Sequence, residues 1–327
     1  MVFSRDILKL DPASEVSTIV AAIRFQVGQE LKRKGAVLGL SGGIDSSVCA
    51  ALCARALGKD RVLGLFMPEA DSSGDSLRLG LLLTETLGIP SCLEDITPVL
   101  NGARCYERRD DAIRKVLPDF GPGWKCKIVL PGILDEAAYA FFSIIAQSPE
   151  GVQTKARLTL DAYLGIVAAT NFKQRTRRMM EYYHADRLNY AVVGTPNRLE
   201  YDQGFFVKNG DGAADFKPIA HLYKSQVYQL AEYLGVPEEI RRRPPTTDTY
   251  SLEQSQDEFY FSLPLEKLDL CLWALGHGIS AEEAAPIVDL TQAQVDRVYS
   301  QIQAKRRSTR YLHMRPLLVR EVTEIHP

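Results

Sequence analysis

The feature that most constrains this chain is a turn rich in glycine and serine, VLGLSGGIDSSVCAALCARAL, from Val37 to Leu57. The apolar run before the turn is typical of a buried strand, and the apolar residues after it recur at helical spacing. Where a parallel strand runs into a helix, the first N–H groups of the helix lack partners and the helix dipole is positive there. The turn therefore predicts an anion site at the carboxyl end of a strand in an α/β sheet.

The residue types in the turn favour a phosphate chain as the anion. Glycines let the backbone approach a ligand closely and serines add hydroxyl donors; the candidate residues are Ser41, Gly42, Gly43, Ile44, Asp45, Ser46 and Ser47. Asp45 would repel phosphates unless a divalent cation stood between them, which favours a Mg²⁺ ligand. The alternative is a structural turn in which Asp45 caps the helix. Neither GxxxxGK[ST] nor GxGxxG is present in the turn, so it is not a Walker A loop or a dinucleotide fingerprint.

Strand-like and helix-like segments alternate over most of residues 1–260. Helical spacing from Val16 to Leu31 predicts a first helix, and RVLGLFM and SCLEDI predict strands on either side of a helix that ends at Gly88. Strands that alternate with helices pair in parallel through right-handed crossovers. We therefore expect an α/β fold, a doubly wound parallel sheet with helices on both faces.

Two regions depart from this alternation. Residues from about 121 to 160 contain extended runs around Ser-Pro-Glu-Gly, in YAFFSIIAQSPEGVQTKARLTL, which predict an inserted hairpin. Residues 261–327 carry amphipathic helical patterns with a basic end, AKRRSTR. We expect this last region to form a C-terminal helical segment and tail after the α/β domain of residues 1–260.

Composition limits the partners and the compartment. The 327 residues include 39 Lys+Arg and 41 Asp+Glu, and this balance argues against general nucleic-acid binding. The N-terminus carries charges too early for a signal peptide, and no apolar run approaches the roughly 20 residues that span a bilayer. The six cysteines form no CxxC pair, and Cys49 and Cys53 fit core packing. We expect a cytoplasmic protein with reduced cysteines and no membrane contact.

Further motifs follow the glycine turn in order. They are NFKQRTRR from Asn171, VVGTPNRLE from Val192, GFFVKNGDGAAD from Gly204, LYKSQV from Leu222 and RPPT from Arg243. SGGIDSS resembles the pyrophosphate loop of the N-type ATP pyrophosphatases. The whole series, over residues 36–246 apart from the hairpin region, resembles ammonia-dependent NAD synthetase, which implies the adenine-nucleotide alpha-hydrolase (HUP) type of fold.

The resemblance implies a reaction and a set of roles. ATP would adenylate the nicotinate carboxylate of deamido-NAD, and ammonia would displace AMP to give NAD; the family also implies a homodimer with the acceptor near the subunit interface. The 41–47 loop would hold the β and γ phosphates of ATP, with Asp45 and Lys224 as catalytic residues. Asp45 and Glu200 would hold magnesium. The other implied contacts are Thr195, Lys224 and Thr246 to ATP, and Arg177, Lys208, Asp215 and Lys305 to deamido-NAD. Thr247 is an equal candidate to Thr246.

The residues themselves support several of these roles. Lys173 and Arg177 lie one helical turn apart, so both are expected to point at one anion, unless they form a solvated basic face. Glu200 follows a predicted strand and could meet Asp45 at a cation; the alternative is a surface salt bridge. Lys224 opens a helix, where the dipole disfavours a lysine, and this indicates an anion nearby.

The loop from Lys208 to Asp215 contains glycines and could close over a substrate, although an ordinary surface turn is the alternative. Three features differ from the family pattern. The hairpin region has no counterpart in short ammonia-dependent enzymes. The expected histidine is missing before Lys305, where Ala304 stands, and the first helix carries no clear aromatic residue for the nicotinate. These differences leave the acceptor half of the site open.

The nitrogen source and the rival functions follow from what the sequence lacks. No glutaminase domain fits the length and position 2 is Val2, so we expect free ammonia or ammonia from a separate supplying enzyme. The runner-up function is an ATP-pyrophosphatase amide ligase that acts on a different carboxylate. A tRNA-thiolating enzyme and a nucleotide sensor without turnover are further alternatives.

Overall fold

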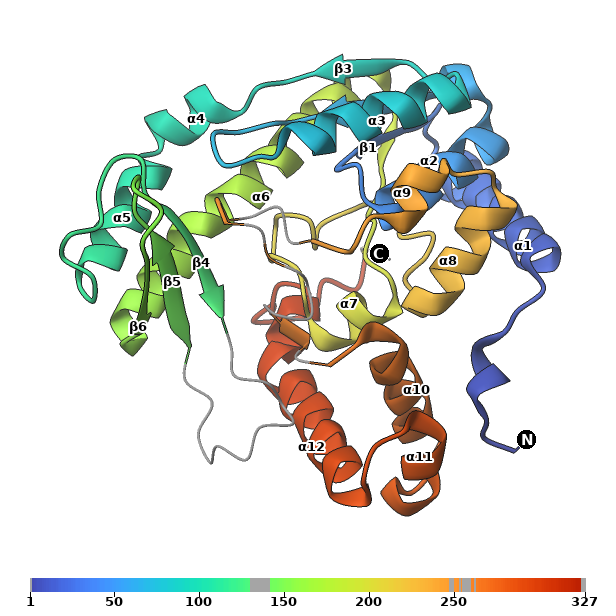
Figure 1. Ribbon diagram of the computed structural model, residues 1–327. Coiled ribbons are helices and arrows are strands. Elements are labelled where there is room, and N and C mark those ends of the chain that lie inside the picture. Colours follow the sequence, from blue (N-terminus) through green and yellow to red (C-terminus); the bar gives the residue numbers. More distant parts are fainter. Residues whose placement is uncertain are drawn as a thin grey trace.

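The computed structural model describes residues 2–129, 142–246, 250–252, 254, 260, 261 and 263–324. Its centre is a parallel four-stranded sheet in the order β3-β2-β1-β7 (Figure 1). The strands are β1 (Ala36–Gly39), β2 (Val62–Phe66), β3 (Ser91–Leu93) and β7 (Ala191–Val192). In register, Ala36 of β1 is paired with Val62 of β2 and with Ala191 of β7. The predicted parallel α/β sheet is confirmed.

Helices cover both faces of this sheet, which explains why β1 and β2 are apolar throughout. Leu38 packs into the core formed with α1, α2 and α8, whereas the neighbouring Val37 packs into the core formed with α4 and α6. The helices of this part are α1 (Pro12–Phe25), α2 (Ile44–Leu57), α3 (Gly74–Leu87), α4 (Thr97–Gly102), α5 (Cys105–Arg114), α6 (Leu160–Leu188), α7 (Arg198–Gln203), α8 (Lys224–Tyr233) and α9 (Glu238–Arg242).

Helix ends follow local chemistry. α1 begins after Asp11, whose side chain accepts a hydrogen bond from Ala13 N, so this start lies earlier than Ser14. α3 ends at Gly88 in the left-handed conformation, as the sequence indicates. The expected basic helix is longer than its basic run and starts after Thr159, which caps it.

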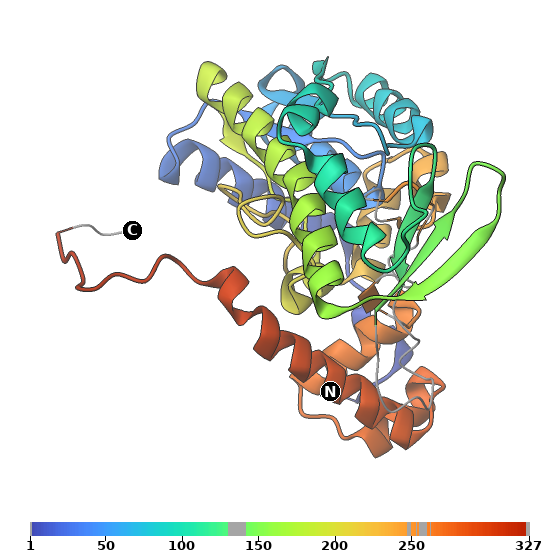
Figure 2. The ribbon, with the colours of Figure 1, turned by 90° about the vertical axis from the view of Figure 1, so that its left-hand side faces the viewer.

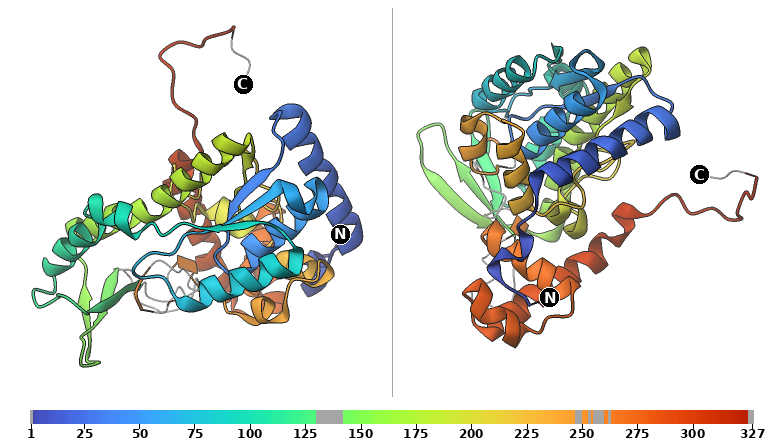
Figure 3. Two further views of the ribbon diagram at one scale, coloured as in Figure 1. Left: turned by 90° about the horizontal axis from the view of Figure 1, so that it is seen from above. Right: turned by 90° about the vertical axis from the view of Figure 1, so that its right-hand side faces the viewer.

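The region around residues 121–160 forms a separate antiparallel sheet. Its strands are β4 (Lys125–Val129), β5 (Ser143–Gln147) and β6 (Gln153–Arg157), in the order β4-β5-β6. β5 and β6 form the predicted hairpin, and β4 adds a third strand that we did not predict. The hairpin run was expected to start at Tyr139, which lies outside the described residues. The sheet packs on α5 and the start of α6, at the opposite end of the molecule from α1 (Figure 3).

The sequence predicts two or three amphipathic helices in the C-terminal segment, and the structure has three: α10 (Leu265–Gly276), α11 (Ala281–Val288) and α12 (Gln292–Thr309). They share a core that includes Leu199 of α7, so this segment packs directly under part of the α/β domain. A short turn, η5 (Arg310–His313), follows α12, and the chain then runs away from the body (Figure 2). The proposed boundary near residue 260 stays a prediction. Among the described residues, no helix combines the length and apolar character needed to cross a bilayer.

Candidate active site

A cavity of about 560 Å³ lies at the carboxyl ends of the parallel strands. Segments that follow three different strands line it: the glycine turn after β1, residues 67–76 after β2, and residues 193–200 after β7. Parallel strands bring these segments to one edge of the sheet, which is where ligands bind in open α/β sheets. The predicted location of the site agrees with this cavity.

The turn between β1 and α2 forms a backbone cradle. Gly42 has a φ of +70°, and a Cβ there would lie 2.7 Å from the carbonyl oxygen of Ser76, so a glycine is required. The hydroxyls of Ser46 and Ser47 donate to the carbonyl oxygen of Gly43, at 3.1 and 2.8 Å. Gly43, and not Asp45, is the N-cap of α2, and no side chain caps this helix. The alternative in which Asp45 caps the helix is therefore wrong, and its role in holding a cation stays a prediction.

Asp45 instead belongs to a polar network with residues of two other segments. Its Oδ1 accepts a hydrogen bond from Asn197 Nδ2 at 3.0 Å, and its Oδ2 is paired with Lys224 Nζ. The backbone N–H of Asn197 donates to Glu200 Oε2 at 3.2 Å. Asn197 thus contacts the carboxylates of both Asp45 and Glu200, and both residues line the cavity.

Lys224 is buried at the first turn of α8. Burial by itself lowers its pKa, but the carboxylates of Asp45 and Glu200 outweigh burial and hold the pKa above its usual value. The position of Lys224 at the start of a helix predicted an anion nearby. In this structure that anion is the carboxylate of Asp45.

The basic residues of α6 divide into two groups. Arg177 lines the cavity and donates to the carbonyl oxygen of Met67 at 3.3 Å. Lys173 is buried elsewhere, and its Nζ contacts Glu69 at 3.0 Å and Asp71 at 2.6 Å. The expectation that Lys173 and Arg177 point at one anion is therefore wrong, and so is the solvated alternative, because two carboxylates already neutralise Lys173.

Several cavity residues were not predicted. Arg243 donates to the carbonyl oxygens of Ser41 and Gly42, at 3.4 and 3.5 Å, and so adds a positive charge beside the cradle. Burial raises the pKa of Glu181 to about 7 against the opposing charge of Arg178, with which it is paired. Arg243 lies in the RPPT motif, 202 positions after Ser41. No sequence pattern links residues of the glycine turn to a residue so far along the chain.

The remaining predicted residues fall into two sets. Thr195, Thr246 and Lys208 line the cavity, whereas Thr247 lies outside the described residues. Asp215 and Lys305 are not among the lining residues. Their substrate contacts, like the other assigned roles, stay predictions.

Both of these side chains have contacts within the fold. Asp215 accepts hydrogen bonds from Val192 N at 2.7 Å and from the Tyr182 hydroxyl at 3.2 Å, at the sheet edge. Lys305 Nζ donates to the carbonyl oxygen of Tyr260 at 2.6 Å and lies 4.0 Å from the centre of its ring. Burial lowers the pKa of Lys305 to about 8.

The C-terminal part reaches the cavity through Tyr311 and Leu312 instead. Lys208 Nζ donates to the carbonyl oxygen of Tyr311 at 2.8 Å, which connects the glycine-bearing loop to this segment. The next residue, His313, makes edge contacts with the rings of Tyr201 and Phe206.

An aromatic wall, defined here as Phe142, Tyr163, Tyr250 and Tyr260, lines another part of the cavity. The rings of Phe142 and Tyr163 are stacked, with centroids 4.1 Å apart. Phe142 directly precedes β5, so the inserted sheet supplies part of the cavity surface. Alternating apolar residues predicted the hairpin but did not indicate that it reaches the site.

Comparisons with known proteins place the chain in a family. The NAD synthase family model matches residues 15–115 and 148–310. The NH(3)-dependent NAD(+) synthetase of Rhizobium meliloti is 62% identical over 99% of this chain and 97% of its own length, and that of Thermotoga neapolitana is 36% identical over 86% and 89%. Among solved structures, the NH3-dependent NAD synthetase of Campylobacter jejuni has a TM-score of 0.61 and 24% identity, over 95% of this chain and 100% of its own; this likeness concerns the fold. The chain belongs to the NAD synthase family.

Proposed function

We propose that this chain catalyses the ATP-dependent amidation of deamido-NAD to NAD with ammonia, through an acyl-adenylate and with release of AMP and pyrophosphate. The observation that carries the proposal is the glycine cradle, which opens into one cavity together with Asp45, Lys224 and Arg243. Family membership and the high identity to NH(3)-dependent relatives support the same reaction.

The chemistry explains why cations gather around the cradle. A carboxylate is a poor electrophile, and adenylation gives it AMP as a leaving group. An anionic carboxylate must then approach a more highly charged triphosphate, and negative charge develops on the departing pyrophosphate. Lys224 and Arg243 are placed to offset this charge while the N–H groups of the cradle bind the phosphate oxygens. Preorganised contacts of this kind are worth about 3–4 kcal/mol each in other enzymes.

The acidic residues suit Mg²⁺, which the family resemblance implies. Oxygen donors are the ligands that Mg²⁺ prefers, and Asp45 and Glu200 both present carboxylates to the cavity. A carboxylate can accept about four hydrogen bonds or ligand contacts, so the contacts of Asp45 with Asn197 and Lys224 leave room for a cation on the same group. Asp45 and Glu200 would hold the ion, which supplies further neutralisation of the pyrophosphate. Lys224 pairs with Asp45 and orients this carboxylate.

The acceptor is proposed to bind on the side of the cavity that the aromatic wall lines. A nicotinate ring is planar and can stack on Phe142 or Tyr163 at little conformational cost. Arg177 and Lys208 line the same cavity and are suitable partners for the phosphates of a dinucleotide. In this proposal the inserted sheet shapes the acceptor pocket.

Isotope labelling tests the nitrogen source. With ¹⁵N-ammonium and no glutamine, we expect the label in the product amide, and with amide-labelled glutamine alone we expect none. Label from glutamine alone would contradict the proposal.

The chain is proposed to act in the cytoplasm as a homodimer, and sedimentation at twice the chain mass would support the dimer.

The identity of the acceptor carboxylate distinguishes the proposed reaction from that of the rival amide ligase. Pyrophosphate release should depend on deamido-NAD when ATP, Mg²⁺ and ammonium are present. Release that deamido-NAD does not stimulate, but another carboxylate does, would favour the rival. No release with any carboxylate would favour a nucleotide sensor.

A further inference from the structure

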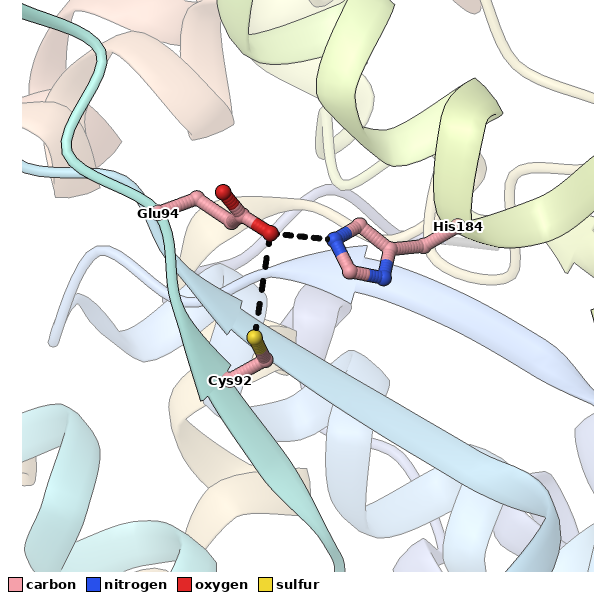
Figure 4. Close-up of side chains that lie close together, drawn as sticks. All are labelled: Cys92, Glu94 and His184. Atoms are coloured by element: carbon pink, nitrogen blue, oxygen red, sulfur yellow. Dashed lines mark hydrogen bonds and ion pairs between the residues drawn. The ribbon is translucent and has the colours of Figure 1, made fainter. Parts of the chain in front are cut away.

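A second group of chemically reactive side chains lies outside the cavity. Cys92 on β3, Glu94 just after β3 and His184 near the end of α6 point toward one another (Figure 4). Cys92 Sγ lies 3.8 Å from Glu94 Oε1, and His184 Nε2 lies 2.8 Å from the same oxygen. One ligand atom from each residue lies within 4.8 Å of the others.

The fold holds these three groups in place. β3 pairs with β2, and Glu94 N donates to the carbonyl oxygen of Phe66 at 2.8 Å, so Cys92 and Glu94 are both fixed to the central sheet. The side chain of His184 is only 3% exposed. Of the six cysteines, five are buried, and Cys92 is the one that solvent reaches.

We propose that Cys92, Glu94 and His184 form a binding site for a thiophilic divalent cation of the Zn²⁺ class, with solvent as the fourth ligand. Thiolate, imidazole and carboxylate together are a donor set that Zn²⁺ accepts, and three protein ligands with one open position is a known arrangement. Zinc–ligand bonds of about 2.0–2.3 Å place tetrahedral ligand atoms roughly 3.3–3.8 Å apart. The 3.8 Å between Cys92 Sγ and Glu94 Oε1 lies at the upper end of this range, and His184 Nε2, which is 2.8 Å from the same oxygen, must withdraw slightly.

The positive charge of Arg187, next to His184, disfavours a cation at this site, so Arg187 must move when the ion binds. Its Nε and Nη2 lie 3.0 and 2.8 Å from His184 Nδ1, which makes Nδ1 the acceptor and Nε2–H the donor to Glu94. A cation on Nε2 needs the other tautomer, with the proton on Nδ1, and Arg187 must then leave. Arg187 is exposed and can turn into solvent. The Cys92 thiol loses its proton, so one proton is released for each ion bound.

The site does not depend on the proposed ligase activity, because none of its three ligands lines the cavity. An ion there would connect β3 to α6. We therefore expect Zn²⁺ to raise the thermal unfolding temperature of the protein, since a ligand that binds only the folded state stabilises it.

The test is a Zn²⁺ titration against a chelating chromophore, combined with Co²⁺ spectra of the full chain. We expect one ion per chain, a thiolate-to-Co²⁺ charge-transfer band, and at least tenfold weaker binding in Cys92→Ser and His184→Gln. Arg187→Gln should bind more tightly, because the competitor is gone. His221→Gln, which alters a surface His–Glu pair without a cysteine, should bind as the wild type does.

The proposal is overturned if the wild type shows no charge-transfer band, or if Cys92→Ser binds as tightly as the wild type. Weaker binding in Arg187→Gln would also overturn it, because Arg187 would then support the ion. The Co²⁺ spectrum uses the unaltered protein, so it decides the matter even if a variant does not fold.

Discussion

Asp45 and Lys224 are partners in a cavity that is partly closed to water. The side chain of Asp45 is 16% exposed and that of Lys224 is 3% exposed. Because both charges have little contact with water, each is stabilised mainly by the other. Removing one member of a buried ion pair is costly because the remaining charge has no partner, typically by about 3–5 kcal/mol. The same pair is therefore needed for stability as well as for the proposed chemistry.

We expect Asp45→Asn to abolish pyrophosphate release and also to lower the free energy of unfolding by about 3 kcal/mol, because Lys224 stays buried without its carboxylate. The double variant Asp45→Asn, Lys224→Met should regain part of this stability but no activity. Thermal denaturation and a pyrophosphate assay measure the two effects. An Asp45→Asn protein as stable as the wild type would show that the pair is not structurally important.

Gly42 offers a second residue-scale prediction. Gly42→Ala should raise the KM for ATP at least tenfold, since its Cβ would meet the Ser76 carbonyl and distort the cradle. Gly58→Ala is the matched control: Gly58 also has a positive φ, of +93°, but nothing lies within 4 Å of its Cβ position. The control should lose about 1–3 kcal/mol of stability and keep its KM for ATP. Equal KM changes in both variants would contradict a specific role for Gly42.

At the scale of elements, the inserted sheet extends the cavity beyond the shared family fold. β4 and β5 fall within residues 116–147, which the family model does not match. Yet Phe142 from this region lines the cavity and stacks on Tyr163 of α6. A segment outside the family model can therefore affect the proposed acceptor pocket without altering the glycine cradle.

We expect Phe142→Ala to raise the KM for deamido-NAD about tenfold and to leave the KM for ATP within twofold, because a stacking contact is worth about 0.5–1.5 kcal/mol beyond the buried area. Val152→Ala serves as the control. Val152 lies at the turn of the same sheet and is 64% exposed. Steady-state kinetics for both substrates make the measurement. A rise in the KM for ATP instead would contradict this prediction, because the aromatic wall would then bind the adenine of ATP.

At the scale of the whole molecule, Asp269 joins the C-terminal helices to the α/β part. It is fully buried on α10, and its Oδ2 accepts a hydrogen bond from Ser225 N at the start of α8, at 2.8 Å. Burial raises the pKa of Asp269 to about 6, from an ordinary 3.8. The folded state therefore holds this proton more tightly than the unfolded chain does.

The pH dependence follows from that shift. The contribution of Asp269 to the free energy of unfolding is greatest below pH 3.8 and is lost as the pH rises through about 6. Asp269→Asn keeps an acceptor for Ser225 N but cannot titrate. Its stability relative to the wild type should therefore improve across this window and stay level above it. Chemical denaturation at several pH values gives the difference, and a constant difference would contradict the raised pKa.

Prediction from sequence succeeded where the signal was local. The glycine turn, the hairpin of β5 and β6 and the end of α3 at Gly88 each depend on residues a few positions apart. It failed where a partner lies far along the chain. Lys173 shares a helix face with Arg177 by spacing, but Glu69 and Asp71 bind it instead. β4 was missed because its partner β5 is separated from it by residues 130–142.

The sequence by itself determined the parallel α/β sheet, the glycine turn at the end of β1 and the family resemblance, since strand and helix periodicity and a turn of seven residues encode them. Only the tertiary structure decided which charges meet. It placed Arg243 beside the cradle, paired Lys224 with Asp45, and placed Asp215 and Lys305 away from the cavity lining. The physical reason is that a buried charge pairs with whichever opposite charge the packed helices bring near. The distance between two side chains far apart in the chain cannot be read from a single sequence.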